Sequence, residues 1–335
     1  MAIQAYAAMR AGAPLEPFEY DPGPLSPEHV EIRVEHCGLC HSDLSMIDSQ
    51  WGGTSYPLVP GHEVVGVVET AGPQVKNVKV GDRVGLGWFS SSCTGCVRCL
   101  SGDHNWCRTV EQTIVGRHGG FADRVRAHWV WATPLPAALD ASSAGPLFCG
   151  GSTVFNPLVQ YAIKPTDRVA VVGIGGLGHL ALKFMRAWGC EVTAFTSSES
   201  KQAEALSLGA HRAVPTGDRD FLLRSPRSFD LILVTVNVAL EWPLFLQAVA
   251  PRGRLHFVGA VMDPISTGAF GLISGQKTMS GSGLGSPATT AKMLDFCARH
   301  AIAPQIESFP MRRINDAIEH LRSGKARYRV VLRNE

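Results

Sequence analysis

A glycine-rich turn between a predicted strand and a predicted helix limits the possible folds of this chain more than any other feature. Residues 168–178 read RVAVVGIGGLG, in which 168–172 is a short apolar strand and 176–188 has the apolar spacing of a helix. In the pattern G-x-G-x-x-G, the first glycine allows a tight turn, the second lets a pyrophosphate approach the backbone, and the third lets the helix pack on the strand. The turn predicts a dinucleotide site at a helix N-terminus, which favours anions. Its candidate cofactor-binding residues are Gly173, Gly175, Gly176, Leu177 and Gly178.

A glycine-rich turn on its own also occurs for purely structural reasons, so the surrounding pattern matters. Further apolar strands are predicted at 191–195, 231–234 and 255–258, and a short helix is predicted at 201–208. Strands that alternate with helices in this way predict a parallel sheet with helices on both faces. This part of the chain is therefore expected to be a doubly wound Rossmann domain of the α/β class.

The rest of the chain has a different pattern of predicted secondary structure. Short strands separated by Gly and Pro predict an antiparallel barrel-like or sandwich unit before about residue 144; they cover residues 30–35, 64–69 and 83–86. The tail after about residue 286 is predicted to form helices at 289–300 and 314–322 and a strand at 328–332. Because chain termini often lie close together, we expect the tail to return to the first domain. The predicted domains are 1–145 with 286–335, and an inserted Rossmann domain at 146–285.

The end of the strand at 191–195 indicates which dinucleotide is bound. NAD-binding sites usually carry Asp or Glu about 20 residues after the glycine turn. Here hydroxyls and a lysine follow the strand instead, which favours a 2′-phosphate and hence NADP(H); these residues are Thr196, Ser197, Ser198 and Lys201. Glu199 argues against this preference but lies a few residues beyond the strand, and Arg212 is a further cationic candidate.

Four of the nine cysteines form the compact pattern C-x₂-C-x₂-C-x₇-C. Four thiolates close a tetrahedral site around one Zn²⁺ and leave no open position, so the predicted role is structural. An iron–sulfur cluster and free thiols are the alternatives. The bacterial ferredoxin motif continues with C-x₃-C-P after its third cysteine, and this chain lacks that continuation, which opposes an iron–sulfur cluster. The predicted ligands are Cys93, Cys96, Cys99 and Cys107.

Composition excludes several classes of protein. Hydrophobic residues make up 45% and charged residues 18% of the 335 residues, a balance that opposes disorder. The formal net charge of +2 provides no electrostatic reason to expect nucleic acid or a membrane surface as a partner. The odd number of cysteines and the lack of a signal-peptide pattern or a spanning apolar stretch predict a protein of the reducing cytoplasm.

Several motifs together resemble one enzyme family. Residues 61–75 read GHEVVGVVETAGPQV, and they are joined by CGLCHSDL at 37–44, PLFCGGSTVFNPL at 146–158 and KARYRVVL at 325–332. Over essentially its whole length the chain is similar to the zinc-containing alcohol dehydrogenases of the medium-chain dehydrogenase/reductase superfamily. It resembles their cinnamyl alcohol dehydrogenase subgroup, and within it the bacterial NADPH-dependent broad-specificity aldehyde reductases. The resemblance implies a GroES-like, β-rich catalytic domain beside the Rossmann domain.

The resemblance also implies roles for single residues. Cys40, His62 and Cys149 match the catalytic zinc ligands, and Glu63 matches a carboxylate that can approach the metal. Asp43 matches the acid that orients the ligands. The proton-passing hydroxyl, the pyrophosphate contact and the nicotinamide contact match Ser42, His41 and Thr153, respectively. Cys37 matches no ligand, and Ser45 stands where many relatives carry the outer histidine of the proton relay.

The predicted function is reversible reduction of aromatic and aliphatic aldehydes to primary alcohols by NADPH, with one catalytic and one structural zinc per chain. A polyol or secondary-alcohol dehydrogenase is the alternative on the same fold, and a non-catalytic zinc-binding scaffold is the alternative of another class. A zinc-free quinone reductase would not need all three catalytic ligands. The resemblance implies a homodimer. Trp51, Trp88 and Phe89 either line an apolar substrate channel or pack as ordinary core residues.

Overall fold

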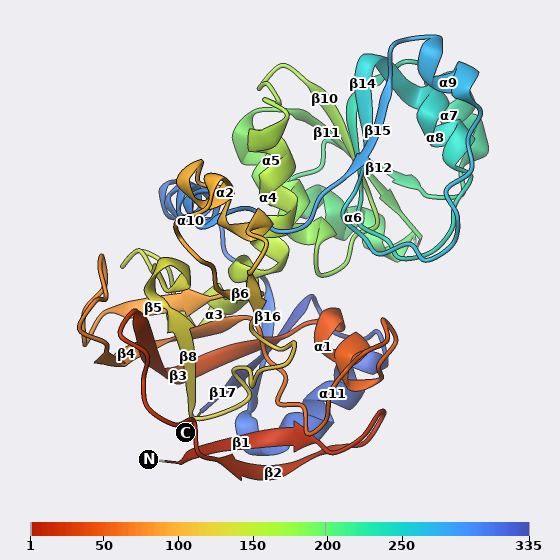
Figure 1. Ribbon diagram of the computed structural model, residues 1–335. Helices are drawn as coiled ribbons and strands as arrows, with labels where there is room; N and C mark the ends of the chain where they lie inside the picture. The colour runs from red at the N-terminus through yellow and green to blue at the C-terminus, as the bar shows by residue number, and fades with distance from the viewer. Residues whose placement is uncertain (1, 198, 335) are drawn as a thin grey trace. The chain divides into compact units, whose positions relative to one another are not determined.

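A computed structural model describes residues 2–197 and 199–334 of the chain (Figure 1). It divides into two compact units: a first unit of residues 1–152 and 284–335, and a second unit of residues 153–283. The predicted domain boundaries, and the assignment of catalysis to one domain and of NADP binding to the other, stay predictions at this point.

The first unit is rich in strands and short helices. Its strands are β1 (Ile3–Ala8), β2 (Leu15–Tyr20), β3 (His29–Leu39), β4 (Val64–Ala71), β5 (Arg83–Leu86), β6 (Phe89–Ser91), β7 (Glu111–Gln112), β8 (Arg124–His128), β9 (Thr133–Pro134), β16 (Ile306–Pro310) and β17 (Arg329–Arg333). Its helices are α1 (His41–Ile47), α2 (Val97–Leu100), α3 (Ala141–Ala144), α10 (Pro287–His300) and α11 (Ile314–Arg322), with 3₁₀ turns η1 (His104–Trp106), η2 (Trp129–Trp131), η3 (Gly145–Phe148) and η4 (Met311–Arg313).

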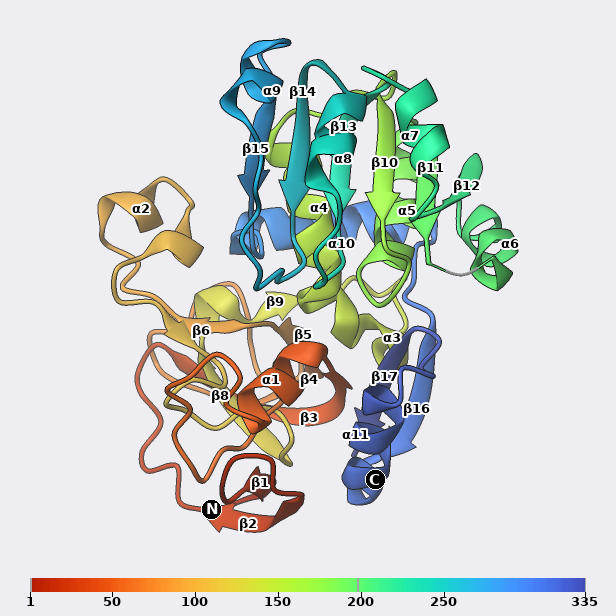
Figure 2. The same cartoon turned by 90° about the vertical axis from the view of Figure 1, so that its right-hand side faces the viewer.

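The main sheet of the first unit joins the two ends of the chain. Its strand order is β16-β17-β3-β4-β5-β9, and β8 also pairs with β3. β17 pairs antiparallel with β3, with Val330 opposite Leu39, so the C-terminal tail forms one sheet with the N-terminal strands (Figure 2). Within the tail itself, β16 and β17 run parallel, because α11 connects them as a crossover.

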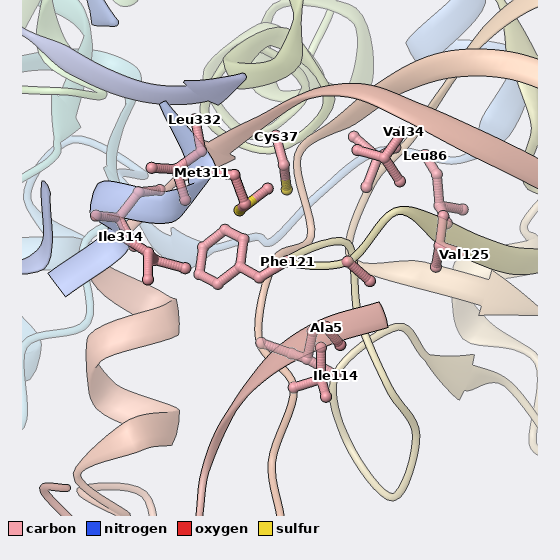
Figure 3. Packing of buried hydrophobic residues seen from close by; sticks show 14 of the residues in the cluster. Ala5, Val34, Cys37, Leu86, Ile114, Phe121, Val125, Met311, Ile314 and Leu332 are labelled. Carbon is pink, nitrogen blue, oxygen red and sulfur yellow. The ribbon is translucent and has the colours of Figure 1, made fainter. Parts of the chain in front are cut away.

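The core of the first unit draws on distant parts of the sequence. Figure 3 shows Phe121 among Met311, Ile314 and Leu332 from the tail, with Ala5 of β1 nearby. All of these side chains are buried. Burial of apolar area contributes roughly 25 cal/mol per Å², so this shared core holds the tail on the N-terminal strands.

The second unit is a parallel sheet with helices on both faces, as the strand and helix alternation predicts. Its strands are β10 (Arg168–Val172), β11 (Glu191–Thr196), β12 (Arg212–Pro215), β13 (Phe229–Val234), β14 (Val249–Phe257) and β15 (Thr278–Gly281). Its helices are α4 (Gly150–Gln160), in which the boundary after Ser152 falls, α5 (Gly178–Trp188), α6 (Ser200–Ser207), α7 (Arg219–Arg224), α8 (Trp242–Ala248) and α9 (Ala269–Ile273). In Figure 1, α4 and α5 lie on one side of the sheet and α7 and α8 on the other.

The strand order of this sheet is β12-β11-β10-β13-β14-β15, and every neighbouring pair is parallel. The order reverses at β10, which confirms the predicted doubly wound α/β architecture. The two edge strands, β12 and β15, were not predicted. Their residues are partly exposed, so they lack the continuous apolar runs of the central strands. Within residues 2–197 and 199–334, no helix combines the length and apolar character needed to cross a membrane.

Candidate active site

Two neighbouring strands bring a cysteine and a histidine together in the first unit. β3 and β4 pair antiparallel with Cys37 opposite Val64, so the residues just after β3 lie beside those just before β4. Cys40 is the N-cap of α1, directly after β3. His62 and Glu63 directly precede β4. The sheet register therefore places these three side chains at one end of the strand pair.

Cys149, between η3 and α4, completes a buried cluster of four side chains. Its Sγ lies 3.9 Å from Sγ of Cys40 and 3.3 Å from Nε2 of His62. With a carboxylate oxygen of Glu63, these potential ligand atoms all lie within 4.8 Å of one another, and all four residues are buried. The structure thus brings together the residues that the sequence predicts around a catalytic metal.

Asp43 is fully buried and orients this cluster from one side. One carboxylate oxygen, Oδ2, accepts a hydrogen bond of 2.9 Å from the backbone N–H of Cys40. The other, Oδ1, accepts one of 2.9 Å from the N–H of Gly61 and lies 2.9 Å from Nδ1 of His62. A histidine that donates its Nδ1–H to a carboxylate keeps the lone pair of Nε2 free to bind a metal, which is the arrangement found around histidine ligands of metals. Here Nε2 faces Cys149.

The electrostatics of the cluster favour a thiolate. The hydrogen bond with Cys149 lowers the pKa of the Cys40 thiol well below its usual range, although burial opposes this shift. The same bond, together with burial, raises the pKa of the Cys149 thiol. Burial disfavours protonation of His62, but the Asp43 carboxylate and Cys40 together outweigh burial and raise the pKa of His62 well above the usual range. A group of sulfur and nitrogen donors that holds anionic charge in a buried place is suited to a divalent cation.

Glu63 carries the orphaned polar atom of the site. Its Oε1 accepts a hydrogen bond from the Arg329 guanidinium, whereas its Oε2 is buried and has no hydrogen-bond partner. Burial raises the pKa of Glu63 to about 7, even though Arg329 acts in the opposite direction. A buried oxygen without a partner, next to two thiols and an imidazole, fits a metal ion as its missing neighbour. Two sulfur donors and one histidine are a typical ligand set for catalytic zinc.

The four-cysteine lobe forms a second cluster in the first unit. Its sulfur atoms lie 3.5 Å apart for Cys93 and Cys107, 3.6 Å for Cys96 and Cys99, and 4.0 Å for Cys93 and Cys99 and for Cys96 and Cys107. Four sulfurs at 2.3 Å from one tetrahedral zinc ion would be about 3.8 Å apart. The nine cysteines are all free of disulfides. The spacing of these sulfurs therefore fits zinc at a site with no open position.

The three other residues predicted by resemblance occupy different environments. Ser42 is half-buried, and its Oγ lies 3.8 Å from Sγ of Cys40, beside the cluster. His41, the first residue of α1, is exposed. Thr153 is buried in α4 and belongs to the second unit. The proton transfer by Ser42 and the cofactor contacts of His41 and Thr153 stay predictions.

The glycine turn of the second unit has the geometry that its pattern predicts. Gly173 has a φ of 93°, in the left-handed region that favours glycine. A Cβ at Gly178 would lie 1.9 Å from the carbonyl oxygen of Gly173, so the close approach of helix to turn excludes a side chain. A Cβ at Gly175 would meet nothing within 4 Å, which leaves an open cradle before α5. This cradle and the N-terminus of α5 fit a dinucleotide pyrophosphate.

The residues predicted around a 2′-phosphate lie at the carboxyl end of β11. Ser197 is exposed, Lys201 is half-buried in the first turn of α6, and Thr196 is buried with an Oγ1 that has no hydrogen-bond partner. Ser198 lies outside the described residues. Arg212 lies opposite Thr193, near the amino end of the parallel strands, and its guanidinium is 5.8 Å from the centre of the Phe221 ring. Because ligands bind at the carboxyl ends of such strands, Arg212 is not placed to contact them.

Two contacts of the catalytic cluster were not predicted from the sequence. Arg329 reaches Glu63 from β17, and its side chain is only 7% exposed. The Trp88 ring packs edge-on against His62 with centroids 4.9 Å apart, and Trp51 packs edge-on against Trp88 at 6.0 Å. Tertiary packing decides both contacts. The only sequence signal for them was the resemblance at the C-terminus and the suggestion that the tryptophans line a channel.

Comparison with known proteins shows the family of this chain. The family described as "Alcohol dehydrogenase GroES-like domain" matches residues 26–137, and the family described as "Zinc-binding dehydrogenase" matches residues 176–299. The chain is 57% identical to an aldehyde reductase from Synechocystis sp. over 330 residues, which cover 98% of each protein.

Solved structures show the same likeness. A cinnamyl alcohol dehydrogenase from Sorghum bicolor is 36% identical with a TM-score of 0.94, covering 99% of this chain and 98% of that one. A cinnamyl alcohol dehydrogenase from Helicobacter pylori complexed with NADP(H) is 28% identical with a TM-score of 0.90, over the same shares. The predicted GroES-like and Rossmann fold is thereby confirmed. The chain belongs to the zinc-binding, medium-chain alcohol dehydrogenase family, as an oxidoreductase of the aldehyde reductase and alcohol dehydrogenase type.

Proposed function

We propose that this chain is a zinc-dependent aldehyde reductase, which reduces a broad range of aromatic and aliphatic aldehydes to primary alcohols with NADPH and catalyses the reverse reaction. The observation that carries the proposal is the buried convergence of Cys40, His62 and Cys149 beside the unpartnered oxygen of Glu63. The likeness to an aldehyde reductase at 57% identity supports the choice of aldehydes as substrates.

The residues of the first unit would have different roles in catalysis. Cys40, His62 and Cys149 would hold zinc, with Glu63 as the carboxylate that can approach it. Bound zinc would supply Lewis-acid polarisation of a carbonyl oxygen, and bound NADPH would supply the hydride. Asp43 keeps the His62 ring in one orientation through its 2.9 Å contact with Nδ1. The hydroxyl of Ser42, close to Cys40, would pass a proton to the substrate oxygen.

A second zinc ion would be structural. Cys93, Cys96, Cys99 and Cys107 would fill its coordination, so substrate could not reach it. Its contribution would be to stability, because four converging cysteines order a lobe that has only two short turns of helix, α2 and η1.

NADP(H) is the proposed cofactor, with Gly173, Gly175, Gly176, Leu177 and Gly178 around the pyrophosphate. The hydroxyls and the ammonium group after β11 support a 2′-phosphate; these residues are Thr196, Ser197, Ser198 and Lys201. His41 and Thr153 would contact the pyrophosphate and the nicotinamide. That the Helicobacter pylori relative is described as complexed with NADP(H) supports this choice.

An aromatic wall beside the metal cluster supports a substrate pocket for apolar aldehydes. Trp88 contacts His62, and Trp51 contacts Trp88. Phe89 instead packs against Trp131 at 5.2 Å, as a core residue does. We therefore assign Trp51 and Trp88, but not Phe89, to the pocket.

A homodimer is the proposed assembly, with the second unit as its contact surface. β15 is an edge strand of the sheet, and the segment leading to it exposes apolar side chains: Met262 is 75%, Phe270 77% and Ile273 70% exposed. Unpaired edges and apolar patches are typical of surfaces that pair with another chain. Light scattering should yield twice the chain mass of 36.0 kDa.

The cytoplasm is the proposed compartment. The nine cysteines form no disulfides, which supports a reducing environment.

The test of the catalytic proposal is a kinetic screen of zinc-replete protein. Aromatic and aliphatic aldehydes should be reduced with NADPH at a higher kcat/KM than ketones and polyols show with either cofactor. A preference for ketones or polyols would instead indicate the secondary-alcohol alternative. A protein that binds zinc but oxidises no NADPH with any aldehyde would contradict the proposal and favour the scaffold alternative.

A further inference from the structure

α1 ends in a turn that sets Ser45 beside Gln50. The backbone N–H of Ser49, a residue with a φ of 52°, bonds to the carbonyl of Met46 at 3.1 Å, and the N–H of Gln50 bonds to the carbonyl of Ser45 at 2.9 Å. This is the Schellman arrangement, in which the second residue after the C-cap, here Gln50 after Asp48, faces the third residue from the helix end, here Ser45. An apolar contact often joins these two side chains. Here the buried hydroxyl of Ser45 donates a 3.0 Å hydrogen bond to Oε1 of Gln50 instead.

Gln50 is therefore tied to Ser45 twice, through its backbone and through its side chain. Trp51 follows it directly. The next residues, Gly52 and Gly53, have φ values of 76° and 71°, and a Cβ at either would meet nothing within 4 Å. Glycine pairs restrain a chain weakly because each glycine has the largest conformational freedom of any residue. The backbone N–H of Gly52 bonds to the carbonyl of Ser49 at 3.0 Å, which closes the turn around Trp51, and the side-chain restraint on this turn comes from Gln50.

Trp51 is 44% exposed and touches Trp88, which in turn packs against His62 of the metal cluster. The position of Trp51 therefore decides how far the aromatic wall extends over the site. The Ser45 hydroxyl donates its proton to Gln50, and a glutamine amide neither takes up a proton nor passes one on near neutral pH. The pair is thus suited to holding a neighbour in place and not to relaying protons.

We propose that Ser45 and Gln50 are positioning residues, whose hydrogen bond holds Trp51 against Trp88 and so limits the bulk of the aldehydes that reach the metal cluster. This inference rests on the proposed function, since it concerns substrate choice at the same site. When the bond is lost, the turn that carries Trp51 loosens, Trp51 moves away from Trp88, and the kcat/KM for bulky aldehydes rises relative to that for small ones.

The test replaces the acceptor and follows substrate choice. In Gln50→Ala, the ratio of kcat/KM for a bulky aromatic aldehyde to that for acetaldehyde should rise about 2- to 10-fold, the range expected for loss of one aromatic pair contact. The change should lie mainly in KM for the aromatic aldehyde. Gln50→Glu keeps an acceptor oxygen for Ser45 and should restore the wild-type ratio. Gln74→Ala, at an exposed glutamine far from this turn in the sequence, is the matched control and should change nothing.

Two further measurements separate the proposal from its alternatives. In a Trp51→Ala background, Gln50→Ala should have no further effect on the ratio, because the residue it holds is gone. Acrylamide quenching of Trp51 fluorescence, obtained as the difference from Trp51→Phe, should increase in Gln50→Ala. Unchanged quenching, or a ratio change that persists without Trp51, overturns the positioning role even if aldehydes are reduced. No aldehyde turnover by the wild-type chain overturns the proposed function, and the selectivity role with it.

Discussion

The guanidinium of Arg329 pairs with the carboxylate of Glu63 in the interior of the first unit, although 266 positions separate the two residues in the chain. Their side chains are 7% and 0% exposed. The antiparallel pairing of β17 with β3 brings Arg329 to the end of β3, where Cys40 follows. Burial disfavours the charged guanidinium, but Glu63, Cys40 and Cys149 together outweigh burial and raise the pKa of Arg329, so the arginine stays charged beside the metal cluster.

Arg329→Met should therefore destabilise the protein strongly. Removal of the cation leaves Oε1 of the buried Glu63 carboxylate without its partner, and the loss of one partner of a buried ion pair costs about 3–5 kcal/mol. Urea unfolding of the zinc-loaded protein measures the effect, and Glu63→Gln in the same chain should recover part of the loss. Arg33→Met is the matched control: Arg33 is 51% exposed in its pair with Glu35, so the change should cost less than about 1 kcal/mol. Equal losses in the two variants would show that the buried pair has no special importance.

His62→Ala should abolish turnover and halve the zinc content. The variant lacks one of three predicted ligands of the catalytic metal, whereas the cysteine lobe, which has no ligand in common with it, keeps its own ion. Atomic absorption should decrease from about two zinc ions per chain to about one, with an unchanged circular dichroism spectrum. Full activity of His62→Ala would refute the ligand assignment.

Asp43→Asn should bind the catalytic zinc about 10- to 100-fold more weakly, because the variant loses the carboxylate that orients His62.

Cys99→Ala should lose the other zinc ion, the one in the cysteine lobe, and should have lower thermal stability. Its catalytic cluster should still bind its metal. Cys99 is buried in the lobe, 3.6 Å from Cys96. Differential scanning calorimetry and metal analysis check this together. Cys190→Ala, at a buried cysteine of the second unit outside both clusters, should keep both zinc ions. A Cys99→Ala protein that is as heat-stable as the wild type would contradict the structural role.

Alanine at two glycines of the dinucleotide turn should have different effects. At Gly178 a Cβ would lie 1.9 Å from a carbonyl oxygen, so Gly178→Ala should destabilise the protein by about 1–3 kcal/mol. At Gly175 a Cβ meets no protein atom, so Gly175→Ala should fold normally but bind NADPH about tenfold or more weakly, because the methyl group occupies the pyrophosphate cradle. Thermal shifts with and without NADPH report both effects. Unchanged NADPH affinity in Gly175→Ala would place the cofactor elsewhere.

The second unit should lose stability in acid through His256. Its ring is buried, with Nδ1 2.8 Å from the hydroxyl of Ser280 and Nε2 2.9 Å from that of Ser282, and burial, with Arg254 adding, lowers its pKa to about 4. Because the unfolded chain binds this proton more readily, the contribution of His256 is complete above about pH 6.5 and is lost as the pH falls towards 4.

His256→Gln removes this titration. Between pH 6.5 and 4, the free energy of unfolding of the wild type should fall more steeply than that of the variant, by up to ~1.4 kcal/mol per pH unit. Urea unfolding at a series of pH values measures the two slopes. Parallel slopes would mean that His256 takes up no extra proton on unfolding.

Local patterns were sufficient to predict much of this architecture. Alternation of strands with helices and the G-x-G-x-x-G turn depend on neighbouring residues, so the doubly wound sheet could be predicted directly. The helix predicted at 314–322 has the bounds of α11, and the strand predicted at 83–86 has those of β5. The edge strands β12 and β15 could not be predicted, because half-exposed strands carry little apolar signal.

The sequence by itself determined which residues are chemically able to bind metal and cofactor: the four closely spaced cysteines, the glycine turn, and Cys40, His62 and Cys149 through their motifs. Only the tertiary structure decided what surrounds them. Arg329 beside Glu63 and Trp88 beside His62 depend on strand pairing and packing between segments that are remote in sequence. Spacing along the chain carries no information about such contacts, because the register of β17 on β3 and the packing of the core bring these residues together.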